Sequence, residues 1–127
     1  MPNNNSPEEL LNQVTALINQ KDLGSIVELY EPEASFIDQS GENINGRENI
    51  RKKLKGFLEM NGKLESVVKK IFPAGNIVLA YSDWTFNALG PDDTSIKLGG
   101  TALDVIRRQS DDTWLVVIDN PWGIEQR

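Results

Sequence analysis

Three short turn sequences divide the second half of the chain into four β-like segments, and this division limits the possible folds most strongly. The turns are rich in Gly, Pro, Asn, Ser and Asp and lie at residues 73–76, 90–93 and 110–112. The segments are rich in β-branched and aromatic residues and lie at residues 64–72, 77–86, 94–109 and 114–119. Such segments, separated by turn residues, are typical of strands joined as hairpins. Because consecutive hairpins pair as a meander, the second half predicts an antiparallel sheet.

The first half instead has the apolar spacing of amphipathic helices. Ser6 is placed to cap a first helix at residues 7–21, where Pro occupies the first helical position. Asp22 can cap a shorter second helix, which Tyr30 closes. A third helix is expected at residues 47–60. The remaining elements are a short strand at residues 34–38 and a loop at residues 41–46.

Helices gathered on one side of an antiparallel sheet are a common way to bury one sheet face. We therefore predict an α+β fold in which three N-terminal helices pack on a strongly curved antiparallel sheet, in the order α-α-β-α-β-β-β-β. Gly99 and Gly100 lie inside the longest strand, where a glycine pair predicts a bulge at which the sheet bends. We expect one domain at residues 7–123, between flexible tails at residues 1–6 and 124–127.

The longest strand has apolar residues on both of its faces. With a period of two, Leu103 and Val105 face one side, whereas Ala102 and Ile106 face the other. A sheet with one face on helices and the other in water alternates more cleanly than this. We therefore predict a homodimer in which the convex face of the sheet packs on a second copy.

The sequence contains neither cysteine nor histidine. This excludes disulfides, thiolate metal sites and cysteine nucleophiles, and it removes the commonest metal ligand and general base. Acid–base chemistry must therefore fall to carboxylates, tyrosine or lysine. The glycines do not form a phosphate-binding loop, and no calcium-loop spacing is present. We expect no metal and no cofactor.

The formal net charge of −6 limits the partners of the chain. An acidic surface repels phosphate backbones and anionic lipids, so we expect neither nucleic acid nor a membrane as a partner. The longest apolar run, at residues 77–81, is too short to span a bilayer. The first residues are polar and have no signal-peptide pattern. We therefore expect a cytoplasmic protein.

Several stretches of the sequence are informative when taken together. They lie at residues 19–30, 34–38, 46–51, 82–84, 101–109 and 118–123. Jointly they resemble the nuclear transport factor 2-like superfamily, a cystatin-like α+β cone that includes ketosteroid isomerases and SnoaL-like cyclases. They look most like a branch of small bacterial members without an assigned reaction. The resemblance implies a pocket between the helices and the concave sheet face, in a fold that serves enzymes, binding modules and dimerisation domains alike.

The resemblance to ketosteroid isomerases implies two catalytic carboxyls. Asp38 falls where those enzymes have a proton-shuttling carboxylate, and Asp104 falls where they have a protonated acid that donates to an oxyanion. Two carboxyls in one apolar cavity push their pKa values apart, which provides one base and one acid. Val14 stands where the isomerases have a tyrosine donor, so isomerisation of ketosteroids itself is not expected. Alternatively, Asp104 is a buried acid bonded to Arg or Tyr, and Asp38 caps the following loop.

Five further residues are expected at the pocket, namely Tyr30, Trp84, Phe86, Asp119 and Asn120. The Tyr30 hydroxyl could point into the pocket, and the other two aromatic side chains could form a wall for an apolar ligand. Packing in the core is the alternative for all three aromatic residues. Asp119 and Asn120 could instead cap the end of the last strand, because a period of two does not decide which way Asp119 faces.

Two functions fit these observations. The first is a SnoaL-like domain that binds a small hydrophobic molecule in the cone pocket, with isomerase, cyclase or hydrolase-type chemistry at the carboxyls. The second is a non-catalytic dimerisation or association domain. Asp104 distinguishes them. Full pairing of its carboxylate with an arginine, without a cavity, favours association, whereas loss of ligand binding in an intact Asp104→Asn variant favours the first function.

Overall fold

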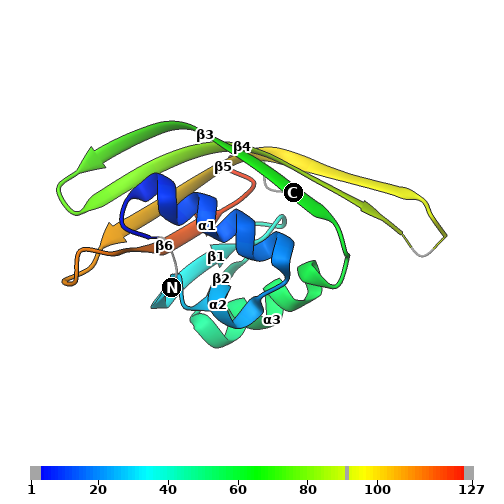
Figure 1. Ribbon diagram of the computed structural model, residues 1–127, viewed down its shortest axis with the longest axis horizontal. Coiled ribbons are helices and arrows are strands. Elements are labelled where there is room, and N and C mark those ends of the chain that lie inside the picture. The colour runs from blue at the N-terminus through cyan, green and yellow to red at the C-terminus, as the bar shows by residue number, and fades with distance from the viewer. Residues whose placement is uncertain (1–3, 91, 125–127) are drawn as a thin grey trace.

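The order of the elements follows the sequence prediction, with one additional strand (Figure 1). The computed structural model describes residues 4–90 and 92–124. The helices are α1 (Pro7–Gln20), α2 (Leu23–Val27) and α3 (Arg47–Leu58). The strands are β1 (Tyr30–Ile37), β2 (Asn43–Asn45), β3 (Lys63–Ala74), β4 (Ile77–Leu89), β5 (Ser95–Arg108) and β6 (Trp114–Asn120). The outer parts of the two predicted tails, residues 1–3 and 125–127, lie outside the described residues.

The first two helices begin at the predicted capping residues. The Ser6 hydroxyl accepts the Glu9 N–H at 3.1 Å at the start of α1. The Asp22 carboxylate accepts the Ser25 N–H at 3.3 Å at the start of α2. These bonds satisfy amides that have no partner within the helix, so local sequence is sufficient to fix both starts. No helix in the described part of the chain is long and apolar enough to cross a membrane.

The six strands form one sheet in the order β2-β1-β6-β5-β4-β3. The four C-terminal strands pair as antiparallel hairpins, as predicted. β1 lies parallel to β6, so the sheet is mixed rather than wholly antiparallel. The chain can form this parallel pair because it passes through β2, α3 and three further strands before it returns beside β1. Figure 1 shows all three helices on one side of the bent sheet.

Two boundaries in the first half differ from the prediction. Tyr30 does not close the second helix, because α2 ends at Val27 and Tyr30 is the first residue of β1. The register of β1 on β6 is irregular between Tyr30 and Ser35, a stretch that includes Pro32, which has no N–H to donate. The predicted loop at residues 41–46 contains the short strand β2, which pairs with the end of β1.

The predicted bulge at Gly99 and Gly100 is wrong. Trp84 lies opposite Gly100 within an unbroken register between β4 and β5. The glycines serve close packing instead, since a Cβ on Gly99 would lie 3.1 Å from the carbonyl oxygen of Trp84. Register shifts occur in other strand pairs, including β5 and β6 between Val105 and Ile106. This last shift affects the site directly.

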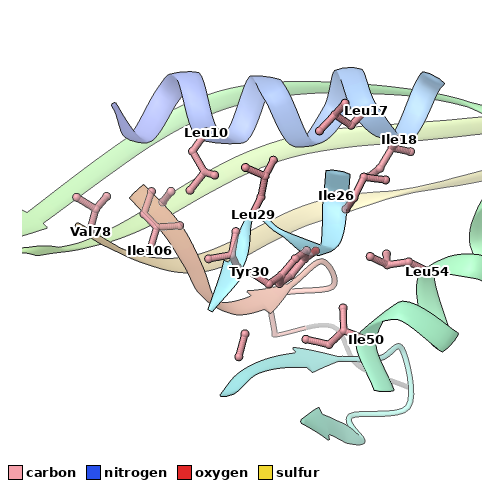
Figure 2. Close-up of a cluster of buried hydrophobic side chains, with 13 residues drawn as sticks. Leu10, Leu17, Ile18, Ile26, Leu29, Tyr30, Ile50, Leu54, Val78 and Ile106 are labelled. Carbon is pink, nitrogen blue, oxygen red and sulfur yellow. The ribbon is translucent and has the colours of Figure 1, made fainter. Parts of the chain in front are cut away.

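The main core lies between the helices and the concave face of the sheet (Figure 2). Leu10 from α1, Ile50 from α3 and Ile106 from β5 are fully buried there. A second cluster near the other end of the long hairpin contains Trp84 and Phe86. Between them these clusters fix the distance between the helices and the sheet, and therefore the space left for a cavity.

The described part of the predicted N-terminal tail lies against the sheet. Asn4 is only 8% exposed. Its side-chain amide donates to the Trp114 carbonyl at 3.0 Å, and the Trp114 N–H donates back to the Asn4 carbonyl at 2.8 Å. These two bonds join the segment before α1 to β6.

Candidate functional site

A cavity of about 250 Å³ lies between the helices and the concave sheet face. Most of its lining is apolar and includes Val14 from α1, Leu54 and Phe57 from α3, and Trp84 from β4. Helices on one side and a curved sheet on the other leave this space because the side chains do not fill the full depth of the cone. The few polar groups in the lining therefore decide what the cavity can do.

Two carboxyls face each other on the sheet side of the cavity. Asp104 on β5 and Asp119 on β6 are direct partners in the strand register. Both line the cavity, and Asp104 is only 7% exposed. Their side chains hydrogen-bond to each other. The backbone N–H of Asn120 donates to Oδ1 of Asp104 at 3.1 Å, so Asp104 is held from two directions.

The inward direction of Asp119 results from the irregular pairing of the last two strands. Val116 is buried opposite Ile106, yet the next register pair joins Val105 to Ile118. Val117 is thus an extra residue on β6, as in a β-bulge. It reverses the alternation, so that Ile118 turns outwards and Asp119 turns into the cavity beside Asp104.

Tyr30 completes a line of three hydrogen-bonding groups. Its hydroxyl donates to Oδ2 of Asp119 at 2.5 Å, and its side chain is only 1% exposed. The Arg47 guanidinium donates to the Tyr30 carbonyl at 2.8 Å and so fixes the start of β1. The sequence predicted that Tyr30 reaches the pocket, and the structure places it there as the first residue of a strand.

The electrostatics separate the roles of the two aspartates. Burial raises the pKa of Asp104 well above its ordinary value. The negative charge of Asp119 raises it further, and so does the hydrogen bond that protonated Asp104 donates to the Asp119 carboxylate. Burial also raises the pKa of Asp119, but the hydrogen bonds from Tyr30 and Asp104 act in the opposite direction. Because the pKa of Asp104 is raised more strongly than that of Asp119, a proton shared by the pair resides on Asp104 in preference to Asp119.

Neither carboxyl of this pair is neutralised by a cation. Within residues 4–90 and 92–124, the salt bridges join Lys53 to Asp38 and Arg107 to Glu31. Burial also raises the pKa of Tyr30 well above its ordinary value, and the Asp119 charge adds to this effect. The tyrosine is thus a stable hydrogen-bond donor at neutral pH.

Asp38 lines the same cavity and also caps the turn after β1. Its Oδ1 accepts the N–H groups of Ser40 and Glu42 at 2.9 and 3.0 Å, and the Ser40 hydroxyl at 2.5 Å. The bond from the Ser40 hydroxyl is the main cause that lowers the pKa of Asp38. Lys53, whose side chain is 46% exposed, lies 3.9 Å away, so this is the open end of the cavity. Asp38 is therefore an ionised group at the entrance.

The other predicted pocket residues differ in position. Trp84 lines the cavity and packs edge-on against Trp122, with ring centroids 5.2 Å apart. Phe86 lies outside the lining and packs against Phe57, with centroids 4.3 Å apart. Asn120 also lies outside the lining and contributes its backbone N–H to Asp104. Phe86 and Asn120 therefore contact residues of the lining, namely Phe57 and Asp104, without lining the cavity themselves.

Sequence analysis did not identify Ser82 and Ser66, which also line the cavity. Ser82 is 4% exposed, and its hydroxyl has no hydrogen-bond partner among the described residues. A sequence signal for Ser82 exists, because it alternates with Ala80 and Trp84 on the apolar face of β4. A lone serine on such a face is polar where the pattern requires an apolar side chain.

No cluster of three or more potential metal ligands occurs among the residues that the structure describes. The site therefore consists of hydrogen-bonding groups in an apolar cavity. A neutral acid, an ionised carboxylate and a tyrosine donor together can give and take a proton.

Comparison with known proteins agrees with this fold. Residues 11–116 match the family model of the SnoaL-like domain. A ketosteroid isomerase-like protein of Erwinia carotovora atroseptica is similar in structure, with a TM-score of 0.77 and 9% identity over 88% of both chains. A protein of Novosphingobium aromaticivorans, described as NTF2-like with a cystatin-like fold, has a TM-score of 0.74 and 14% identity over 87% of this chain and 75% of that one.

A third similar structure has a different kind of description. It is described as a calcium/calmodulin-dependent protein kinase type II association domain of Thiobacillus denitrificans. Its TM-score is 0.75 at 16% identity, over 91% of this chain and 92% of that one. No curated protein matches the chain in sequence. Identities this low show a common fold and nothing about the reaction. Together with the family match over residues 11–116, the common fold confirms the predicted superfamily resemblance.

Proposed function

The chain belongs to the SnoaL-like domain family, within the nuclear transport factor 2-like superfamily, and on this basis we propose that its cavity binds a small hydrophobic molecule and that the Asp104–Asp119 pair moves a proton to or from it. The observation that carries the proposal is the pair itself. Two hydrogen-bonded carboxyls face each other in a mostly apolar cavity and have no cation beside them in the described chain. Such an arrangement favours proton transfer more than structural support, because a buried charge without a cation destabilises the fold.

The two carboxyls have different roles in this proposal. Asp119 keeps the negative charge and is the base, which takes a proton from a carbon next to a ligand carbonyl. The electron pair of the broken C–H bond moves to the carbonyl oxygen and forms an enolate. Asp104 then turns its O–H from the neutralised Asp119 to this oxygen and stabilises its charge. Return of the proton from Asp119 to another carbon completes an isomerisation. In a cyclisation the enolate carbon instead attacks a second carbonyl of the ligand, and the oxygen of that carbonyl takes the proton from Asp119.

Tyr30 is a positioning residue in this scheme. Its hydroxyl is bonded to Asp119, so it orients the base instead of contacting the ligand oxygen. Val14 lines the cavity where the resembling isomerases have a tyrosine donor. Asp104 therefore supplies the oxyanion contact without that second donor, which supports a reaction that differs from ketosteroid isomerisation.

The test is hydrogen–deuterium exchange at C2 of 1-tetralone, a bicyclic ketone, followed by NMR in D₂O. We expect the wild-type protein to accelerate the exchange and Asp119→Asn to abolish the acceleration. Asp104→Ala, which removes the donor, should slow it by about a hundredfold, the usual loss for an oxyanion donor. Binding of 1-tetralone is measured separately from the rise in unfolding temperature that it causes.

Asp38→Asn is the matched control, because Asp38 is the other carboxylate of the cavity and the base that the resemblance implies. In our proposal this variant keeps its exchange activity. Loss of exchange in Asp38→Asn with full activity in Asp119→Asn would refute the role of the pair and make Asp38 the base.

We also propose that two copies associate through the convex face of the sheet. The strand register places four apolar residues in one row across this face, namely Phe72, Leu79, Val105 and Ile118. The Phe72 side chain is 50% exposed and the Ile118 side chain is 36% exposed. Neighbouring exposed apolar side chains of this kind are typical of an interaction surface. The similarity to a structure described as an association domain supports association of this chain with a second copy.

Sedimentation velocity of Ile118→Lys tests this association. We expect a dimer for the wild-type protein and a monomer for the variant. Leu89→Lys is the control, because Leu89 is 65% exposed on the same face but three polar positions of β4, at Asp83, Thr85 and Asn87, separate it from the row. A dimer that survives Ile118→Lys would refute this interface. Dimerisation combined with no ligand binding would favour the association function alone.

A further inference from the structure

We propose that Ser82 is a second hydrogen-bonding position for the ligand, so that the cavity takes a neutral molecule of one or two rings with an oxygen-bearing group at each end. One oxygen lies at the Asp104–Asp119 pair and the other at the Ser82 hydroxyl. The inference rests on the proposed function of the cavity, and it adds the chemical class of the ligand.

The first observation is the unpartnered hydroxyl. Ser82 lies at the middle of β4, is 4% exposed and lines the cavity. Its Oγ has no hydrogen-bond partner in the described part of the chain. Buried hydroxyls almost always have a partner, and one without it destabilises the folded protein. A ligand oxygen would satisfy this group.

The second observation is the position of Ser82 relative to the carboxyls. Ser82 is paired with Ala102 across β4 and β5, and Asp104 lies two residues further along the same strand. The two side chains are therefore diagonal neighbours on the concave face, about 7–8 Å apart between Cα atoms. Both line the cavity, with the small Ala102 between them. A rigid molecule of one or two rings can reach both positions at once.

Ser66 extends the same diagonal by one strand. It lies on β3 opposite Trp84 and also lines the cavity. The polar side chains thus form an oblique line across strands β3 to β6, with apolar residues on both sides. The volume of about 250 Å³ lies just below the usual range of ligand pockets, which fits a ligand of this size.

The charges of the lining indicate a neutral ligand. Asp104 and Asp119 keep one negative charge between them, and the lining cation, Lys53, lies 3.9 Å from Asp38 at the open end. An anionic group placed in the interior would be repelled by the carboxylate. Hydroxyl, carbonyl and ether oxygens can bond to a serine and to a carboxyl pair without this penalty.

The experiment compares 1-tetralone with 6-hydroxy-1-tetralone, which has a second oxygen at the opposite end of the ring system. Binding of each compound to the wild-type protein and to Ser82→Ala is measured by isothermal titration calorimetry. We expect the wild-type protein to bind the hydroxylated ketone about two- to tenfold more tightly, the net effect of one hydrogen bond. Ser82→Ala should bind both ketones equally. Ser95→Ala, a change at an exposed serine of β5, is the matched control and should keep the preference.

The free proteins provide a readout that needs no ligand. If Ser82 has no structural partner, Ser82→Ala unfolds at the same temperature as the wild-type protein or at a higher one. A lower unfolding temperature would overturn the inference, because it would reveal a bond within the chain. A preference that persists in Ser82→Ala, or that is absent from the wild-type protein while 1-tetralone still binds, would overturn the inference and leave the proposed function intact. Binding of neither ketone would overturn both.

Discussion

Replacement of Asp104 by asparagine should change the free energy of unfolding much less than the same replacement of Asp119. Asp104 donates to Asp119 and accepts the Asn120 N–H at 3.1 Å. The amide of an Asp104→Asn variant can do both, since it has an N–H₂ and an oxygen. Asp119 instead accepts two bonds, from Tyr30 at 2.5 Å and from Asp104. The amide of an Asp119→Asn variant has one oxygen for these two donors and no charge.

The structure allows the size of both effects to be estimated. A hydrogen bond to a charged group contributes about 1.5–3 kcal/mol, so we expect Asp119→Asn to lower the free energy of unfolding by about this amount. We expect Asp104→Asn to change it by less than about 1 kcal/mol at pH 4. About 1 kcal/mol corresponds to a shift of roughly 4 °C in unfolding temperature for a chain of this length.

The pH dependence provides the sharper test. Burial raises the pKa of Asp104 in the folded protein, so the folded state keeps a proton that the unfolded chain has already released. The wild-type stability contributed by this group is therefore complete below the ordinary carboxyl pKa and falls as pH rises through the raised value. Asp104→Asn removes this loss. Relative to the wild type, the variant should gain about 1.4 kcal/mol between pH 4 and pH 8 for each unit of pKa shift.

The assay is urea unfolding at pH 4, 6 and 8, followed by tryptophan fluorescence and read from the midpoint at constant slope. Trp84 and Trp122 lie at the cavity and report its loss. Equal pH dependence in the wild type and Asp104→Asn would show that Asp104 is not the group that holds the proton. A loss of several kcal/mol in Asp104→Asn at pH 8 would refute the assignment of the two roles.

Three further predictions follow from individual contacts. Tyr30→Phe removes the donor to Asp119 and should lower the free energy of unfolding by about 1.5–3 kcal/mol, measured in urea, and an unchanged stability would show that this bond contributes nothing. Gly123→Ala should lower the free energy of unfolding in urea by about 1–3 kcal/mol, because the φ angle of Gly123 is +58° and a Cβ would lie 2.6 Å from the Thr101 carbonyl oxygen. Gly24→Ala is the control, since a Cβ there would meet open space, and an equal loss in both variants would contradict this reason. Calorimetry should show that 2-naphthoate binds at least about tenfold more weakly than 2-naphthol, because the carboxylate of the pair repels it, and equal affinities would contradict a charged pair.

Local sequence was sufficient for most of the secondary structure. The helix starts at Ser6 and Asp22 depend on hydrogen bonds within one turn, so neighbouring residues specify them completely. The hairpins depend on turn residues in the same way. The exceptions were Tyr30, assigned to a helix but found in β1, the strand β2 within a predicted loop, and the bulge predicted at Gly99 and Gly100. The parallel pairing of β1 with β6 was also not predicted. That pairing joins segments some eighty residues apart, and no local pattern specifies it.

The sequence by itself determined that an acidic, histidine-free chain must place any acid–base chemistry on carboxyls, tyrosine or lysine, and that Asp104 lies within a strand. Only the tertiary structure decided which carboxyl meets Asp104. Strict alternation along β6 would turn Asp119 away from the face that Val116 occupies, but the extra residue Val117 reverses it. Because register is fixed by packing between strands rather than by the residues of one strand, the pair and its tyrosine exist only in the folded sheet.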